Sequence, residues 1–295
     1  MDENSLWNFF AREIITSESK SYICTKYVGF IGCTEYLGIS DNSYTHENIK
    51  AKTVANAALG GGDLALFGTG CLYTWPKSIT EVMHCFENAQ IVDVRNFLDD
   101  SNSRKTFGGC FATTLGSVCH EIGHIFDLGH TQSGIMGNGF DFVNRVFTVT
   151  NQTQELPKRV TSKVELNVNV NSDPRLTKLR YTNRYLDLFH YQKGNDLTYF
   201  ERNSAIILAY HKWFNQYTDI SSGEVICIKN GKTRVITSKQ YPLRLVEFRD
   251  KESALMISNY SFLGESILDF NIPETIVDVS CDVFVIDDIG NIFKF

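Results

Sequence analysis

The chain has 295 residues, of which 43% are hydrophobic and 21% charged, the composition of a globular protein with a substantial core. Its formal net charge of -6 offers no basic surface to a phosphate backbone, so we expect no nucleic-acid partner. The sequence contains no apolar run near the roughly 20 residues that cross a bilayer, so we expect no membrane span.

The first residues indicate a helix and not a targeting segment. Residues 5–15 (SLWNFFAREII) place apolar side chains at helical spacing, with Ser5 as an N-cap candidate. The start is acidic and then amphipathic, without the basic region, apolar core and cleavage site of a secretory signal. We therefore expect a cytoplasmic protein, or a secreted one if a leader is missing from the sequence.

Short strands and helices alternate in the next part of the chain, which indicates a layer of sheet and helix. The expected elements are a buried strand at 27–34, a helix at 45–59 capped by Thr45 and ended by Gly60–Gly62, one or two strands at 64–76, a helix at 78–88 with a capping box of Ser78 and Glu81, and a strand at 91–97. Residues 110–126 (CFATTLGSVCHEIGHIF) then predict a long helix.

The character of the sequence changes after this helix. Residues 148–196 are rich in Asn, Thr, Lys and Gln, which is typical of a polar insertion. Helical spacing returns at 196–217. From Gly223 onward, short β-rich runs follow one another, and Asn230-Gly231 between two of them predicts a hairpin. We expect a small β-sandwich-like domain over residues 218–295.

The candidate metal ligands and the candidate catalytic base lie in the stretch HEIGHIFDLGHTQSGIM, residues 120–136. On a helix, His120 and His124 lie on one face about 6 Å apart, so both rings can bind one zinc ion. Zinc makes water more acidic, and Glu121 lies where a general base could take the proton. This HExxH pattern on a helix is the general motif of zinc metalloproteases.

A catalytic zinc needs a third protein ligand, and His130 is the nearest candidate. It can reach the same ion only if the chain turns back after Phe126. Such a turn needs a positive φ, which favours glycine, but Asp127 occupies the position; Asp and Asn tolerate this conformation best among the other residues. Two alternatives stay open from the residues alone, namely Asp127 itself or the distant Glu155 as the third ligand.

The pattern resembles HExxHxxGxxH followed by a methionine turn, the signature of the metzincin zinc endopeptidases, and the short gap to Met136 is similar to the matrixin branch. The context LGGGDLALFGTGCLYTWP resembles more closely a little-studied eukaryotic family of proposed zinc metallopeptidases, over roughly residues 20–145, with weaker echoes in AIILAYHKWFN and PLRLVEFR. The chain departs from the metzincin pattern at Asp127, and no cysteine-switch propeptide is visible.

The resemblance implies a role for each matching residue. His120, His124 and His130 would be ligands, Glu121 the base, and Met136 a hydrophobic floor beneath the metal, with Asp127 supporting the site as its hinge. The resemblance also implies an edge strand that pairs with extended substrate, for which residues 64–73 are the candidate by their order in the chain.

These observations lead to one expectation for the whole chain. The fold class is α+β, with a metzincin-like catalytic domain in residues 1–217 (a mixed twisted sheet plus the active-site helix, interrupted by the insertion at 148–196) and a small β-rich domain in residues 218–295. The expected function is hydrolysis of peptides or proteins by a zinc-dependent endopeptidase with one catalytic ion. The alternative is a weak or inactive zinc-binding pseudo-peptidase that serves as a protein- or glycan-binding module. The sequence does not identify a partner for the β-rich domain.

Overall fold

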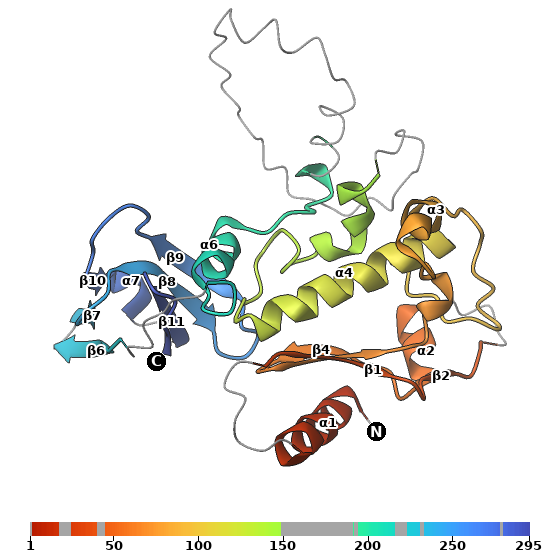
Figure 1. Cartoon of the computed structure of the whole chain (residues 1–295), viewed down its shortest axis with the longest axis horizontal. Helices are drawn as coiled ribbons and strands as arrows, with labels where there is room; N and C mark the ends of the chain where they lie inside the picture. The colour runs from red at the N-terminus through yellow and green to blue at the C-terminus, as the bar shows by residue number, and fades with distance from the viewer. Residues whose placement is uncertain are drawn as a thin grey trace, which may run out of the picture.

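A computed structural model describes residues 2–17, 25–39, 45–148, 191, 194–215, 223–230, 233–277 and 280–295. Helices and several small sheets share the chain, so the α+β class is confirmed. Along the longest axis of Figure 1, a half built around helix α4 lies beside a half built from the C-terminal strands. Nearly all of the predicted insertion at 148–196 lies outside the described residues. No helix in the described ranges combines the length and apolarity that a bilayer crossing requires.

A mixed three-stranded sheet forms the centre of the first half. Strand β5 (Leu64–Gly68) lies between β1 (Tyr27–Ile31), which is parallel to it, and β4 (Ala58–Gly61), which is antiparallel. Helix α1 (Glu3–Ser17) covers one face of the sheet and helix α4 (Phe107–Ile125) covers the other (Figure 1).

The side chains of β5 alternate between two buried clusters, one on each face of the sheet. Leu64 and Leu66 share a buried cluster with Leu6 of α1, whereas Ala65 and Phe67 share one with Ile125 of α4. Successive side chains of a strand point to opposite faces, so a strand covered on both faces reads as a continuous apolar run.

Two predicted boundaries in this half are wrong. Among the described strands, β1 pairs only with β5, and Val28 and Phe30 are 47% and 45% exposed, so the strand is not buried as predicted. The helix predicted at 45–59 is α2 (His46–Ala51), and Thr45 caps it as expected by accepting a bond from the Asn48 amide. Beyond it, β3 (Thr53–Val54) pairs with β2 (Glu35–Tyr36), and β4 follows.

Gly60–Gly62 do not end a helix, because pairing with β5 overrides the helical spacing of the residues before them. Gly62 has a φ of 54° in the turn between β4 and β5. At Gly60, the backbone comes so close to α4 that a Cβ would overlap the Glu121 carbonyl oxygen. A glycine at this position is required for close packing of sheet on helix.

The elements between residues 64 and 97 differ from those predicted. After β5, the chain forms the short helix η1 (Leu72–Thr74) and no second strand. The helix at 78–88 is a 3-10 turn η2 (Ile79–Glu81) followed by α3 (Val82–Phe86), and its capping box is wrong: Ser78 makes no cap bond, and Glu81 accepts from the Lys77 amide.

The strand predicted at 91–97 is also wrong. Only Ile91 forms a bridge, with Thr106, because Asp93 accepts bonds from Arg95 and Asn96 that fold the segment into a turn. The long helix α4 is confirmed, and it begins three residues before the predicted start, at a Thr106 cap that accepts from the Gly109 amide.

The C-terminal residues form two antiparallel sheets that share one core. The first sheet contains β10 (Asp269–Ile272), β7 (Thr233–Ser238) and β6 (Val225–Asn230); the second contains β12 (Ile292–Lys294), β11 (Cys281–Asp287), β8 (Leu243–Asp250) and β9 (Met256–Ser261). The short helix α7 (Glu274–Val277) adds Ile276 to the cluster that holds Ile236 of β7 and Phe248 of β8. The hairpin of β6 and β7 is confirmed, while Gly231 itself lies outside the described residues.

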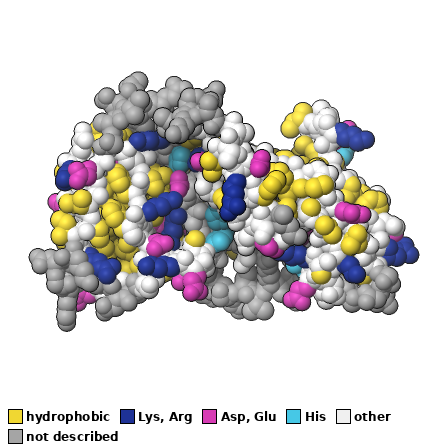
Figure 2. Space-filling view, turned by 90° about the horizontal axis from the view of Figure 1, so that it is seen from below, with side chains coloured by type: hydrophobic (Ala, Val, Ile, Leu, Met, Phe, Trp, Pro, Cys, Tyr) yellow, Lys and Arg dark blue, Asp and Glu magenta, His cyan; other side chains and the backbone are white. Residues whose placement is uncertain are grey.

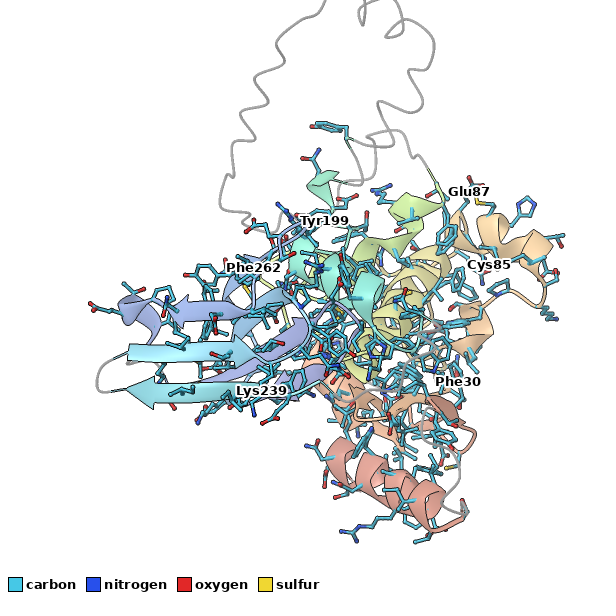
Figure 3. All side chains as sticks on the ribbon, turned by 60° about the vertical axis from the view of Figure 1, so that its left-hand side comes forward. Phe30, Cys85, Glu87, Tyr199, Lys239 and Phe262 are labelled. Atoms are coloured by element: carbon cyan, nitrogen blue, oxygen red, sulfur yellow. The ribbon has the colours of Figure 1, made fainter. Side chains whose placement is uncertain are left out.

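A further apolar cluster joins the two halves of the molecule. Helix α6 (Arg202–Tyr210), shorter than the predicted helix at 196–217, contributes Ile207. Ile207 packs with Met136 from the first half and with Leu245 and Phe284 from the C-terminal sheet. Figure 3 shows Phe30 and Phe262 in opposite halves, with packed side chains between them. The domain boundary at residues 217 and 218 remains a prediction, and side chains from both sides of it share this core.

Candidate metal centre

Helix α4 and the turn after it bring three histidines together. The Nε2 atom of His124 lies 3.1 Å from the Nε2 atom of His120, as expected for positions i and i+4, and 3.1 Å from that of His130. Within the described part of the chain, these residues form a group whose ligand atoms could hold one metal ion. Tetrahedral zinc with bonds of about 2.0–2.1 Å separates its nitrogen ligands by about 3.3 Å, which is close to these two distances.

The chain turns back at Asp127 to deliver His130. Asp127 has a φ of 64°, as predicted for the hinge position. Its amide donates to the His124 carbonyl, and the Leu128 amide donates to the Gly123 carbonyl at 3.1 Å. This pair of bonds is the Schellman motif, which usually has glycine at the position of Asp127. The aspartate therefore adopts the conformation that glycine would otherwise supply.

Each imidazole is oriented by a backbone carbonyl. The Nδ1 atoms of His120, His124 and His130 lie 2.7, 2.9 and 2.6 Å from the carbonyl oxygens of Ile135, Leu128 and Ser253, respectively. A carbonyl can only accept, so each Nδ1 carries the proton and each Nε2 presents a lone pair to the centre. Burial lowers the pKa of His120 and lowers that of His124 to about 4, which keeps both rings neutral as ligands require.

The C-terminal sheet holds the third histidine. The His130 amide donates to the Ala254 carbonyl, and the His130 carbonyl accepts from the Met256 amide at 2.8 Å. Ser253 and Ala254 lie in the connection between β8 and β9. No short sequence motif predicts this contact, because its partners are far apart along the chain. On the face drawn in Figure 2, histidine side chains emerge near the middle of the molecule.

Glu121 lies between α4 and the sheet. Its Oε2 accepts from the Gly60 amide of β4 at 2.7 Å. Burial raises the pKa of Glu121 to about 7, and the nearby Glu3 carboxylate adds to this effect, while the bond from Gly60 opposes it. A carboxylate with this pKa can both accept and return a proton near neutral pH.

Met136 packs under helix α4. Its side chain is fully buried, and a Cβ on Gly123 would overlap its sulfur. The turn that carries Met136 is closed by a bond from the Thr131 amide to the Met136 carbonyl. The Ile135 amide donates to the backbone carbonyl of Tyr199, which is labelled in Figure 3, at 2.7 Å. Gly123, inside the HEIGH stretch, thus makes room for this sulfur.

A cavity of about 400 Å³ opens beside Glu121. Ser117 and Thr113 of α4 line one wall, and Phe140 and Asp141 of helix η3 (Gly139–Val146) contribute to another. Its ionisable lining residues are Glu3, His46, Lys50, Asp100, Glu121 and Asp141, so carboxyl groups outnumber basic groups.

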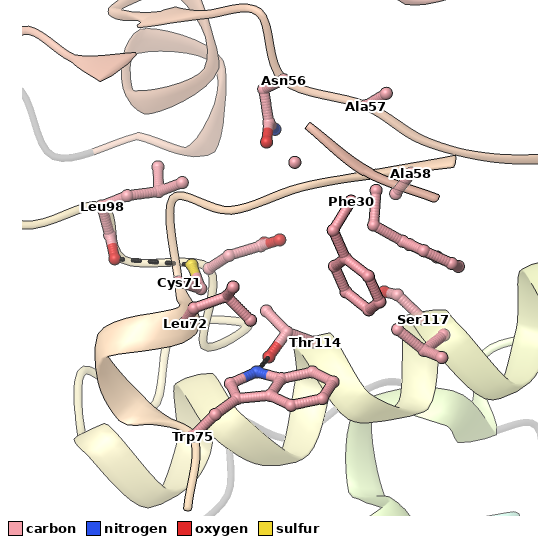
Figure 4. A pocket seen from close by; sticks show the side chains of 14 residues that line it. Phe30, Asn56, Ala57, Ala58, Cys71, Leu72, Trp75, Leu98, Thr114 and Ser117 are labelled. Carbon is pink, nitrogen blue, oxygen red and sulfur yellow. Dashed lines mark hydrogen bonds between the residues drawn. The ribbon is translucent and has the colours of Figure 1, made fainter. Parts of the chain in front are cut away.

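A smaller cavity of about 50 Å³ adjoins it, and both are lined by Ala58 and Ser117. Figure 4 shows Phe30 and Trp75 around this smaller space, with the Trp75 indole donating to the Thr114 hydroxyl at 2.9 Å. The polar cavity near Glu121 therefore continues toward an aromatic end.

The predicted substrate edge at residues 64–73 is wrong, because β5 is the central strand of its sheet. The edge strand that contacts α4 at Glu121 is β4. Its outward amides at Ala58 and Gly60 donate to the side chains of Glu3, at 2.6 Å, and Glu121. The carboxylates therefore occupy the donors that an added strand would use.

Of the two alternative third ligands, Asp127 is not part of the histidine group that the described residues form. The Asp127 carboxylate faces Lys294, with Oδ1 2.6 Å from Nζ, and His211, with Oδ2 3.5 Å from Nε2. Glu155 lies outside the described residues.

Comparison with known proteins gives two matches. The family model Metallopep, described as "Putative peptidase family", matches residues 1–234. The chain is 38% identical over 96 residues to "Putative zinc metalloproteinase YIL108W" of Saccharomyces cerevisiae, which covers 31% of this chain and 14% of that protein. The match therefore spans about a seventh of the yeast relative's length. No solved structure matches the chain.

Proposed function

Because the chain belongs to the Metallopep putative peptidase family, we propose that it is a zinc-dependent endopeptidase with one catalytic ion and Glu121 as general base. The observation that carries the proposal is the convergence of three Nε2 atoms, each on a ring whose Nδ1 is bonded to a backbone carbonyl. Three neutral imidazoles leave one position of a tetrahedral ion open, which is the pattern of catalytic and not of structural zinc.

Each residue of the site would have a separate role in the proposed hydrolysis. His120, His124 and His130 would hold zinc, which supplies Lewis acidity toward a peptide carbonyl and lowers the pKa of water. Glu121 takes the proton from the attacking water and passes it to the leaving amine. Burial of Glu121 supports this role, since it raises the pKa of the carboxyl to about 7. Met136 would form the apolar floor of the zinc site, and Asp127 would support the turn that leads to His130.

The surroundings of Glu121 support a peptide as the substrate. The cavity of about 400 Å³ beside its carboxylate is large enough for one amino-acid side chain. Strand β4 borders the same space through Ala58, whose outward amide could bind the carbonyl of an extended peptide once Glu3 moves away. A metzincin-like arrangement of sheet, helix and histidines is part of this proposal.

The test compares the wild type with Glu121→Gln. Glutamine is nearly isosteric and can still accept the bond from Gly60, but it cannot take a proton. We expect stoichiometric zinc by elemental analysis in both proteins and a loss of about 10²- to 10⁴-fold in cleavage of a mixed peptide library by the variant. Glu13→Gln, at an exposed glutamate of α1, is the matched control and should cleave like the wild type.

Two outcomes would contradict the proposal. A wild type that does not retain zinc would contradict the metal site. Stoichiometric zinc with equal, negligible turnover in wild type and Glu121→Gln would instead indicate a protein that binds without cleaving.

A further inference from the structure

Asp127 makes contacts that a glycine at the same hinge could not make. Its Oδ1 lies 2.6 Å from Nζ of Lys294 on β12, and its Oδ2 lies 3.5 Å from Nε2 of His211, just after α6. Three segments that are far apart in the sequence thus meet at one carboxylate. The positive φ of Asp127 makes a substitution by most other residues strained, yet glycine would adopt it more easily. The side chain must therefore offer something that compensates for this cost.

The contact with His211 has a defined direction. The Trp213 amide donates to Nδ1 of His211 at 3.1 Å, so in the neutral ring the proton is on Nε2, the atom that faces Asp127. His211 is only 7% exposed, and its ring packs edge-on against Phe126, the residue before Asp127. The histidine is thus held in place on two sides, with Nε2 facing the carboxylate.

The backbone of Asp127 is tied to the C-terminal sheet as well. Nη2 of Arg249 donates to the Asp127 carbonyl at 2.8 Å, and Nε of the same guanidinium bonds to the fully buried Glu247 at 2.6 Å. The guanidinium also lies over the Phe284 ring, 4.2 Å from its centroid. A charged group fixed by a buried carboxylate and an aromatic face has little freedom, so it gives the hinge a rigid anchor.

We propose that Asp127 is a positioning residue that locks the end of α4 onto β12 and the end of α6, and thereby fixes the turn that carries His130 to the metal. Glycine would form the same turn and keep the bond from Arg249, but it would lose both side-chain contacts. The proposal rests on metal binding by the three histidines, which is part of the proposed function, and does not depend on peptide cleavage.

The experiment measures zinc affinity of the full chain by competition with a chromophoric chelator, together with the visible spectrum of the cobalt-substituted protein. Partners behind metal ligands typically contribute about 10- to 100-fold in metal affinity. We expect Asp127→Gly to bind zinc at least about 10-fold more weakly and to change the cobalt spectrum. Lys294→Met should weaken zinc binding by about threefold, because exposed ion pairs contribute little, while Lys294→Arg should restore it.

Two further variants sharpen the result. In Asp127→Gly combined with Lys294→Met, affinity should be no lower than in Asp127→Gly alone, because the contact that Lys294 makes is already lost. Lys239→Met removes a comparable exposed ion pair with Glu224, 2.6 Å long, on the C-terminal sheets, and should leave zinc affinity unchanged.

The proposal is overturned if Asp127→Gly is folded and binds zinc as tightly as the wild type with the same cobalt spectrum. If Asp127→Gly does not fold, Lys294→Met decides: wild-type zinc affinity in that variant would equally overturn the proposal. If the wild type does not bind zinc, the proposed function itself fails, and this outcome is distinct from the two that overturn the role of Asp127.

Discussion

Nδ1 of His130 lies 2.6 Å from the carbonyl oxygen of Ser253, although 123 positions separate the two residues in the chain. The ring of the third histidine is therefore oriented by the β8–β9 connection and not by the helix that carries the other two. This contact makes the C-terminal sheet part of the candidate metal centre.

The shape of the β8–β9 connection depends on Asp250, whose Oδ1 accepts from the amides of Glu252 and Ser253 and from the Ser253 hydroxyl. Asp250→Ala should loosen this turn, let the Ser253 carbonyl move, and weaken zinc binding by about 10-fold in a chelator competition. Asp93→Ala, which removes another turn-forming aspartate, is the control and should leave zinc affinity unchanged. Equal affinity in both variants would show that the turn does not need its aspartate to orient His130.

Gly60 and Gly61 are neighbours with different constraints. A Cβ at Gly60 would overlap backbone atoms of Glu121, whereas a Cβ at Gly61 would meet only Trp7 at an ordinary 3.9 Å. Gly60→Ala should therefore push β4 away from α4, lowering the free energy of unfolding by about 1–3 kcal/mol and breaking the bond to Glu121. Gly61→Ala should change it by less than about 1 kcal/mol. Urea unfolding of the two variants measures the difference, and equal stabilities would argue against the close approach.

Asp127 should make stability depend on acid. Burial alone would raise the pKa of Asp127, but hydrogen bonds from His211 and Lys294, with the charges of Lys294 and Lys26, hold it at about 2, below the ordinary 3.8. The folded state therefore binds this proton less readily than the unfolded state does. The resulting stabilisation, about 2 kcal/mol, is fully present above about pH 5 and disappears as the pH falls from about 4 to 2.

Asp127→Asn removes this ionisation and supplies the comparison. We expect the wild type to exceed Asp127→Asn in unfolding free energy by about 2 kcal/mol near pH 6 and by much less near pH 3, with a chelator present to exclude metal effects. A difference that stays constant between the two pH values would contradict the assignment of the low pKa to these contacts.

The charge around the large cavity should be visible in substrate preference. Glu3, Asp100 and Asp141 line it together with Lys50, and Trp75 lies at the adjoining aromatic end. A cationic side chain is attracted by this excess of carboxylates and can also lie against an aromatic face. Among peptides that differ at one position, kcat/KM should be about 10-fold higher for lysine or arginine than for glutamate at the position that fills the cavity.

Glu3→Lys places a positive charge at the rim and should reduce this preference, whereas Glu13→Lys, elsewhere on α1, should not. A preference for acidic side chains in the wild type would contradict this account of the cavity.

Local signals in the sequence were sufficient to predict several features. The i, i+4 spacing predicted the pair His120 and His124 on one helix, and the turn chemistry of aspartate predicted the positive φ at Asp127. The Asn230-Gly231 signal predicted the hairpin of β6 and β7. Each of these depends on a few neighbouring residues, and the periodicity of α4 predicted the helix, although not its start after Thr106.

Features that depend on residues far apart in the chain could not be predicted from local sequence signals. Residues 52–59 have helical spacing, but Ala58 and Leu59 pair with Phe67 and Leu66 of β5. Nothing local marks Gly60 as a contact point for Glu121, or Lys294 as a partner of Asp127. The central place of β5 could have been recognised, since an uninterrupted apolar run is typical of a strand covered on both faces.

The anchoring of His130 by the β8–β9 connection has a consequence for the order of events during protein synthesis. Chains leave the ribosome N-terminus first, at about 5 to 20 residues per second, so the Ser253 carbonyl follows His130 by about 6 to 25 s. During that interval a nascent chain can form α4 but has no acceptor for the third imidazole. The proposed metal centre would then be completed late, when translation has passed Ser253 and the newly made polypeptide can fix the third imidazole.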